Sequence, residues 1–255
     1  MKSPVLFVGL ILILAGCALE EETGFGRIKL QVFDSPPPSG VEHIYLTITD
    51  VHVSTGDDEW IPLAQPETRF DFLDLVNGAT AVLVDDAIEP GTYAQLRLIV
   101  SDSNEIVIDG QSYPLRVPSG EQTGVKLNLD FTVEEDELVE ILIDFDASQS
   151  ITWTPGNYQL RPSFKALKKV VSGTVSGTVT DTAGAAIVNA LVEATGTSES
   201  FATVSDSLGS YTLIVVEGIY DVEGSAQGYV SSDTVYSGIS VEAESDLTGY
   251  DFVLD

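Results

Sequence analysis

Alternating apolar and polar residues run through most of this chain, and this pattern predicts β-strands. The clearest example is Val41–Ser54, in which Ile44, Leu46 and Ile48 fall on one face. Successive side chains of a strand point to opposite faces of a sheet, so the alternation predicts strands with one buried face. The other segments with strand patterns are Arg27–Phe33, Trp60–Leu63, Tyr93–Val100, Ile106–Tyr113, Val125–Phe131, Leu138–Phe145 and Tyr158–Lys168.

Turn signals separate these segments. Pro90-Gly91 precedes one strand, Asp109-Gly110 predicts a hairpin turn, and the acidic run Glu134–Asp136 joins two further strands. The 3.6-residue period of a helix is not sustained along the sequence, and only Asp71–Val76 and Ala147–Ile151 are expected to form single turns. The predicted fold class is therefore all-β.

The character of the chain changes after Lys168 and Lys169. From residue 170 onward the sequence has thirteen Asp or Glu residues and no Lys, Arg or His. New strand patterns follow, and their inward-facing residues are Tyr211, Leu213, Tyr220 and Val222. We expect two β-sandwich domains in tandem, residues 27–168 and residues 171–255, each able to fold by itself.

The first residues have the features of a secretory signal. Lys2 precedes the apolar run Val5–Leu14, and small residues lead from there to Cys17, the only cysteine. A membrane-spanning helix needs about 20 apolar residues, and Glu20–Glu22 end this run too early. The segment Leu14–Cys17 resembles the lipobox of bacterial lipoproteins.

The lipobox resemblance implies that residues 1–16 are a signal peptide and that the thiol of Cys17 receives a lipid. Several acyl chains at this residue would anchor the protein stably in the cell envelope, with residues 17–26 as a short acidic tether. Ala18 stands where an aspartate would argue for inner-membrane retention. The resemblance therefore implies the outer membrane.

The formal net charge of −29, from 40 acidic and 11 basic residues, excludes nucleic-acid binding by charge, which needs a basic surface. A single cysteine excludes an internal disulfide. The two histidines, His43 and His52, are nine residues apart, so they are expected on opposite faces of a regular strand and are not expected to share a metal. No cofactor is expected.

Short motifs in the first domain resemble one family. They are Asp34-Ser35-Pro36, Trp60, Asp71–Gly78, Pro90–Tyr93 with Arg97-Leu98, Pro118–Gly120, Thr123–Lys126, and Asp144–Asp146 with Ser150. In this order they resemble a family of bacterial lipoprotein domains known only as a domain of unknown function, over about residues 25–166. The resemblance implies no activity.

The motifs of the second domain resemble the carboxypeptidase regulatory-like domain, over about residues 171–254. They are Val171–Asp181, Ala185–Ala194, Ser205–Leu213, Gly218–Val222 and Ala226–Tyr229. The resemblance implies a small transthyretin-like β-sandwich. In the namesake this domain accompanies a zinc peptidase, and the present sequence has no peptidase domain. Related folds include starch-binding modules, so sugar binding stays open by analogy of fold.

Asp144 and Asp146 are candidate functional residues because they flank Phe145, which puts both carboxylates on one face of a strand. Two such carboxylates suit glycoside hydrolysis or calcium binding. The alternative is a solvated sheet face, or turn hydrogen bonds to Ser148 and Ser150, and we favour it. Asp71 and Asp74 are expected to cap a turn.

Aromatic residues that could stack on a sugar include Trp60 and Trp153, and each could equally fill the core. The segments Asp181–Gly184 and Asp206–Gly209 have the look of calcium loops, but the twelve-residue EF-hand pattern is absent, and we favour simple turns.

We therefore predict a non-enzymatic, membrane-anchored envelope lipoprotein that acts as a binding or structural module. Its expected partners are the membrane, through Cys17, and a glycan or an envelope protein. The alternatives are a carbohydrate-binding lipoprotein and, less favoured, a hydrolase that uses Asp144 and Asp146.

Overall fold

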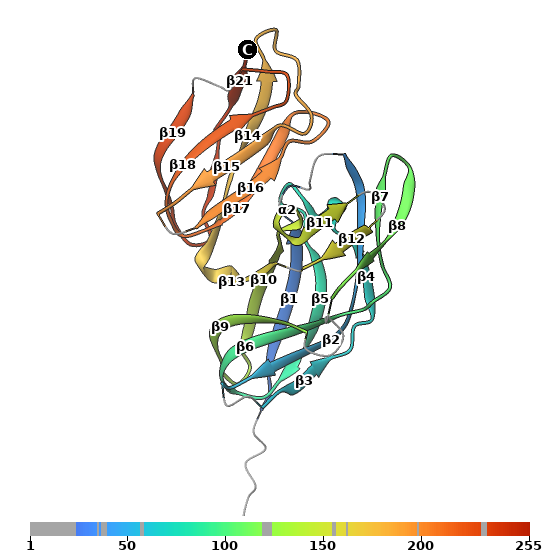
Figure 1. The fold of residues 1–255 in the computed structure, drawn as a ribbon. Helices are drawn as coiled ribbons and strands as arrows, with labels where there is room; N and C mark the ends of the chain where they lie inside the picture. The colour runs from blue at the N-terminus through green and yellow to red at the C-terminus, as the bar shows by residue number, and fades with distance from the viewer. Residues whose placement is uncertain are drawn as a thin grey trace, which may run out of the picture.

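The structure is a computed structural model that describes residues 24–34, 36, 40–56, 59–118, 124–154, 157–161, 163–197, 199–230 and 234–255, without the side chains of residues 153, 154 and 170. Two β-sandwich domains follow one another along the long axis of the molecule (Figure 1). The predicted all-β class with tandem sandwiches is confirmed. Cys17 lies outside the described residues.

The first domain has a smaller sheet of four strands. In order they are β13 (Phe164–Lys168), β10 (Leu138–Phe145), β1 (Gly26–Asp34) and β5 (Ala81–Ile88). β1 and β10 are parallel, while β5 and β13 are antiparallel to their neighbours. Alternate residues of β1, namely Ile28, Leu30 and Val32, enter the core of the first domain.

The larger sheet is built on the long strand β2 (Val41–Ser54). Strands β7 (Asn104–Ile108) and β6 (Gly91–Val100) pair along one edge of it, and β4 (Thr68–Asp71) and β3 (Ile61–Ala64) along the other. β9 (Val125–Val133) lies beyond β6, and β8 (Gln111–Arg116), β12 (Asn157–Leu160) and β11 (Ile151–Thr154) follow beyond β7. The short helices η1 (Phe72–Leu75) and α2 (Ala147–Ser150) connect strands.

Several predicted elements of the first domain are confirmed. β2 and β10 have the bounds expected from the alternation, and Asp109 and Gly110 form the turn between β7 and β8 with φ of 51° and 69°. The structure differs in two respects. Residues 158–168 form two strands in different sheets, and the strands β4, β5 and β11 were not predicted; in β5 the exposed middle, Asp85–Ala87, breaks the alternation.

β2 is not a regular strand, which changes where the histidines lie. The register shifts between Ile48 and Asp50, so the buried positions change from even numbers (Ile44 to Ile48) to odd numbers (Val51 and Val53). A bulge of one residue reverses which face the following side chains take. His43 and His52 therefore lie on the same outer face, against the expectation for a regular strand, at opposite ends of β2.

The second domain is a sandwich of two four-stranded sheets. The first sheet holds β17 (Ser210–Val216), β14 (Ser172–Asp181), β20 (Asp246–Thr248) and β21 (Phe252–Leu254). The second sheet holds β16 (Ser200–Val204), β15 (Leu191–Thr195), β18 (Gly218–Ser225) and β19 (Val235–Val241). Tyr211 and Leu213 of β17 and Tyr220 and Val222 of β18 are buried in the shared core, as predicted.

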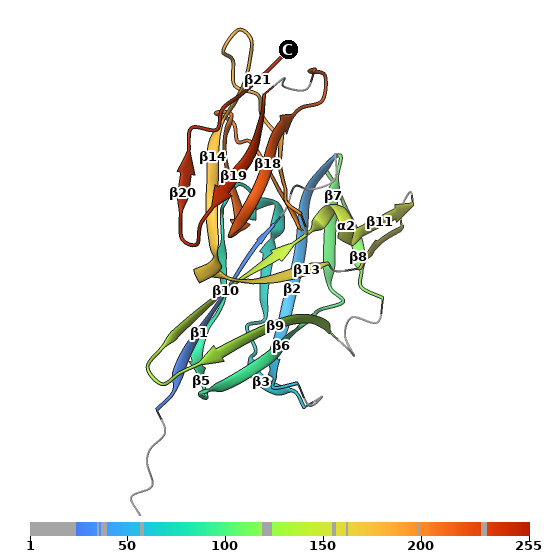
Figure 2. The ribbon, with the colours of Figure 1, turned by 90° about the vertical axis from the view of Figure 1, so that its left-hand side faces the viewer.

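The two domains are joined by more than the connecting chain. β13 leads through the short 3₁₀ helix η2 (Lys169–Val171) into β14 at the waist of the molecule (Figure 2). Three apolar side chains of the first domain, Phe33, Leu142 and Leu167, belong to the buried cluster of the second domain. At the junction the smaller sheet is therefore buried on both faces, one against the larger sheet and one against the second domain.

Candidate functional site

The two candidate carboxylates lie at the junction of the domains but not in one site. Asp144 is only 3% exposed and lines a small cavity of about 10 Å³ between Phe33 and Thr203. A cavity of this size holds about one water molecule. Asp146 follows the end of β10, and its Oδ1 accepts hydrogen bonds from the Gln149 amide (3.0 Å) and the Ser148 hydroxyl (2.7 Å).

The Asp146 carboxylate is thus the N-cap of α2. Its hydrogen bond to Ser148 is one of the turn hydrogen bonds expected if Asp146 has no catalytic or calcium-binding role. A side-chain oxygen at this position satisfies amides that the helix leaves without partners. Asp146 also lines an open groove of about 630 Å³ between the domains, beside Lys165 and Phe201, whereas Asp144 does not. Asp144 lines the small cavity and Asp146 lines the groove. The two carboxylates therefore do not form the acid and base pair of a glycoside hydrolase.

A hydrogen-bonded clamp fixes the junction. Asn77 lies in a turn after η1, and its amide N–H donates to Thr203 Oγ1 over 3.0 Å. Its side chain donates to the carbonyl of Ser210 (3.2 Å) and accepts from the amide of Thr212. At Gly78, which has φ of 76°, an added Cβ would lie 2.9 Å from Thr212 Cγ2. Sequence reasoning did not identify this clamp, because its partners are more than 120 residues away.

Trp60 lies just before β3 on the outer face of the larger sheet, where basic side chains surround it. The guanidinium carbon of Arg97 lies 4.3 Å from the centre of the Trp60 ring, and the Lys126 ammonium lies 5.4 Å from it. His52, Arg97 and Lys126 stand in register on β2, β6 and β9. Trp60 is therefore neither a core residue nor a bare stacking platform.

His52 adds no charge to this group near neutral pH. Burial, and then the positive charge of Arg97, hold the pKa of His52 below its usual value, and the carboxylate of Asp50 only partly opposes this. Among the described residues, His52 Nδ1 and Arg97 Nε are buried without a hydrogen-bond partner. The local positive charge therefore comes from Arg97 and Lys126.

The remaining candidates take other positions. Trp153 is on β11, opposite Tyr158, and its side chain is not described. His43 Nδ1 lies 2.5 Å from Asp71 Oδ2, and Asp71 also caps η1, the role expected for it. Within the described ranges, no group of three or more His, Cys, Asp or Glu side chains is placed to hold a metal ion, and no helix is long and apolar enough to span a membrane.

The two acidic loops of the second domain are turns, as favoured above. Asp181 Oδ1 accepts from the amides of Ala183 (2.9 Å) and Ala185 (2.8 Å). Asp206 Oδ1 accepts in the same way from Leu208 (2.8 Å) and Ser210 (2.9 Å). Each carboxylate thus stabilises its own loop, the usual use of Asp in turns.

The acidity of the second domain predicts a salt effect. Thirteen carboxylates without a cation repel each other most in the folded state, and the Debye length falls from about 30 Å at 0.01 M salt to about 3 Å at 1 M. We expect residues 171–255 to melt about 4–8 °C higher in 1 M NaCl if screening recovers about 1 kcal/mol. Thermal melts in NaCl, and in calcium at matched ionic strength, measure this rise in melting temperature. A melting temperature that does not change with salt would contradict the prediction.

Comparison with protein families finds two matches, in the order predicted from the sequence. A domain of unknown function (DUF4382) matches residues 25–162, and a carboxypeptidase regulatory-like domain matches residues 174–255. No curated protein matches the sequence.

Solved structures give only slight likenesses. The chain is similar to the type II cohesin–X-dockerin complex of Acetivibrio cellulolyticus (19% identity, 32% of this chain and 56% of that one, TM-score 0.26). It is also similar to the Bacillus anthracis TIE protein (10% identity, 90% and 34%, TM-score 0.28) and the shaft pilin SpaA of Lactobacillus rhamnosus GG (8% identity, 91% and 98%, TM-score 0.25). At these TM-scores they assign no function.

Proposed function

The chain belongs to the family of the domain of unknown function DUF4382, and from this premise we propose that it is a non-enzymatic envelope lipoprotein that displays its second domain at a fixed orientation. The first domain would act as a rigid stand anchored through Cys17. The carboxypeptidase regulatory-like domain would be the part held away from the membrane.

The observation that carries this proposal is the shared core at the junction. Neighbouring domains move relative to each other by default unless their interface is large and hydrophobic. Here Phe33, Leu142 and Leu167 enter the core of the second domain, and Asn77 adds three hydrogen bonds. Such a junction favours a single rigid body.

The direction of the chain supports the role of a stand. β1 runs from Gly26, beside the turn that joins β9 to β10, to Phe33 at the junction. Its nine residues at about 3.3 Å each span roughly 30 Å. A tether before Gly26 would therefore enter at the end of the first domain that faces away from the second domain (Figure 1).

The hydrolase alternative receives no support from the junction. Asp144 is buried beside a cavity too small for a sugar, and Asp146 Oδ1 is occupied as a helix cap. We expect Asp144→Asn with Asp146→Asn to change stability at most, and glycan or ester turnover that this pair abolishes would argue against the proposal.

The stand is tested by measuring the distance between the domains. Spin labels on Asp130→Cys and Ser240→Cys, both exposed, are placed in a chain that also carries Cys17→Ala. We expect one narrow distance distribution. Gly78→Val should broaden it, because the new side chain meets Thr212.

Gly110→Val is the matched control for Gly78→Val. Gly110 has a similar φ of 69°, but nothing lies within 4 Å of an added Cβ. Both substitutions therefore introduce the same backbone strain, and only one of them disturbs the junction. A broad distribution in the starting chain would overturn the rigid stand.

A further inference from the structure

Arg97 and Lys126 bring two positive charges together beside the ring of Trp60. They are directly opposite each other on β6 and β9, and like charges in this position destabilise a sheet. The chain has 40 acidic residues and only 11 basic ones. Nevertheless, neither Arg97 nor Lys126 forms an ion pair with any acid in the part of the chain that the structure describes.

The same sheet contains a similar arrangement in which a carboxylate is present. On β4, Arg69 lies over the ring of Tyr45, 4.4 Å from its centre, and its guanidinium pairs with the carboxylate of Glu105. Around Trp60, Arg97 takes the place of Arg69, but the charged neighbour is Lys126 instead of an acid. Glu105 supplies the carboxylate of the Tyr45 group, whereas no described acid forms an ion pair with the cations of the Trp60 group.

We propose that Trp60, Arg97 and Lys126 form a binding site for a carboxylate-bearing sugar, such as a uronic acid residue of a polysaccharide. The carboxylate of the sugar would lie between Arg97 and Lys126. Its position relative to Arg97 would match that of Glu105 relative to Arg69. Carboxylates bound to Arg and Lys form charge-assisted hydrogen bonds, which are stronger than neutral ones. The part of the half-buried indole of Trp60 that stays exposed beside the cations offers an apolar surface for the sugar ring.

Neighbouring groups suit the rest of a sugar. Gln95 and Asn128 are the next outward pair along the same two strands, and Gln95 Nε2 donates to Asn128 Oδ1 over 2.7 Å. The oxygen of Gln95 and the NH₂ group of Asn128 can bond hydroxyl groups. Both residues line an open depression of about 390 Å³, which is large enough for a monosaccharide unit.

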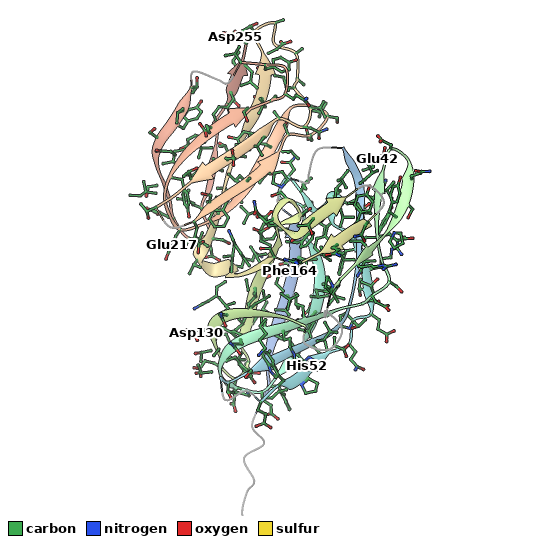
Figure 3. The ribbon with its side chains drawn as sticks, in the orientation of Figure 1. Glu42, His52, Asp130, Phe164, Glu217 and Asp255 are labelled. Atoms are coloured by element: carbon green, nitrogen blue, oxygen red, sulfur yellow. The ribbon has the colours of Figure 1, made fainter. Side chains whose placement is uncertain are left out.

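An acidic sugar fits this surface better than an anionic membrane. The site is at the end of the first domain where Figure 3 labels His52 and Asp130, away from the second domain. Asp85, Asp86, Asp136 and Glu137 line the depression where the described chain begins. A flat membrane of anionic lipids would meet these four acids, whereas a soluble sugar would meet the two cations and, in the depression beside them, Asp130. At about 0.15 M salt the Debye length of about 8 Å screens the more distant acids.

The test is calorimetric titration of the full chain with a trigalacturonate at about 0.15 M NaCl. The comparison ligands are a neutral galactose trisaccharide, inorganic phosphate and vesicles that contain anionic lipid. We expect the trigalacturonate to bind and the other three to show no comparable binding. Equal binding of the neutral trisaccharide, binding of phosphate or vesicles in place of the trigalacturonate, or no binding at all would each overturn the proposal.

Lys126→Gln is the decisive variant because the Lys126 side chain is exposed, so folding should not suffer. We expect it to weaken binding about tenfold to a hundredfold, the loss typical of one hydrogen bond to a charged group. Arg116→Gln is the matched control, since it removes one positive charge from an exposed position on β8 of the same sheet. An equal loss in both variants would show general charge attraction and would overturn the site.

Discussion

Replacing Leu142 by alanine is expected to destabilise the second domain, although Leu142 belongs to a strand of the first. Leu142 is buried and packs in the core cluster of residues 175–254. Truncating a buried leucine costs about 2–5 kcal/mol, from lost burial and from the cavity that remains. We therefore expect the free energy of unfolding of the second domain to fall by an amount in this range.

Amide hydrogen exchange will show which strands the Leu142→Ala substitution destabilises. In Leu142→Ala, the amides of β14 and β17 should exchange faster, because local protection follows the stability of each cooperative unit. Ile141→Ala is the matched control, since the neighbouring residue is fully buried in the core of the first domain. It should accelerate exchange in β1 and β2 and leave β17 unchanged. Unchanged exchange in β17 in both variants would contradict a shared core.

The same reasoning bears on the isolated second domain. Residues 171–255 contain two complete sheets, and that they fold alone remains a prediction. Without Phe33, Leu142 and Leu167, however, part of the buried cluster becomes exposed to water. The fragment should therefore melt at a lower temperature than the second domain within the full chain.

Local pattern was sufficient to predict most strands. The bounds of β2 and β10, the Asp109-Gly110 hairpin and the Asp146 turn all depend on neighbours in sequence. The burial of β10 on both faces is also indicated by the sequence, because Ile141, Leu142 and Ile143 form an unbroken apolar run. Such runs are typical of strands covered on both sides. What covers the second side cannot be read from the run itself.

The candidate site was less predictable because it depends on which strands are neighbours. Trp60 was identified as a sugar-stacking candidate, but Arg97 and Lys126 were not, since they come from strands 37 and 66 residues farther along the chain. The one-residue bulge in β2 places His52 on their face, and periodicity alone predicts the other face. Asp144 and Asp146 were expected to share a face, but the strand ends between them.

Replacing Cys17 by serine is expected to abolish lipid attachment, because a serine hydroxyl cannot form the thioether that the lipobox resemblance implies. In cells given labelled palmitate, the unchanged protein should incorporate label and lose residues 1–16. The serine variant should incorporate none and should keep those residues, as intact mass will show. Each buried CH₂ contributes about 0.8 kcal/mol to membrane binding, so loss of several acyl chains removes the anchor entirely.

Ala18→Asp is the control that separates lipidation from sorting. It leaves the thiol of Cys17 in place, so the protein should still incorporate label and lose residues 1–16. By the lipobox resemblance, an aspartate after the cysteine should move the protein from the outer to the inner membrane, which fractionation of the two membranes will measure. Continued labelling of the Cys17→Ser variant would contradict the anchor itself. Labelling lost in both variants would mean that the residue after Cys17 is needed for recognition, and the destination of the protein would then have to be tested by other means.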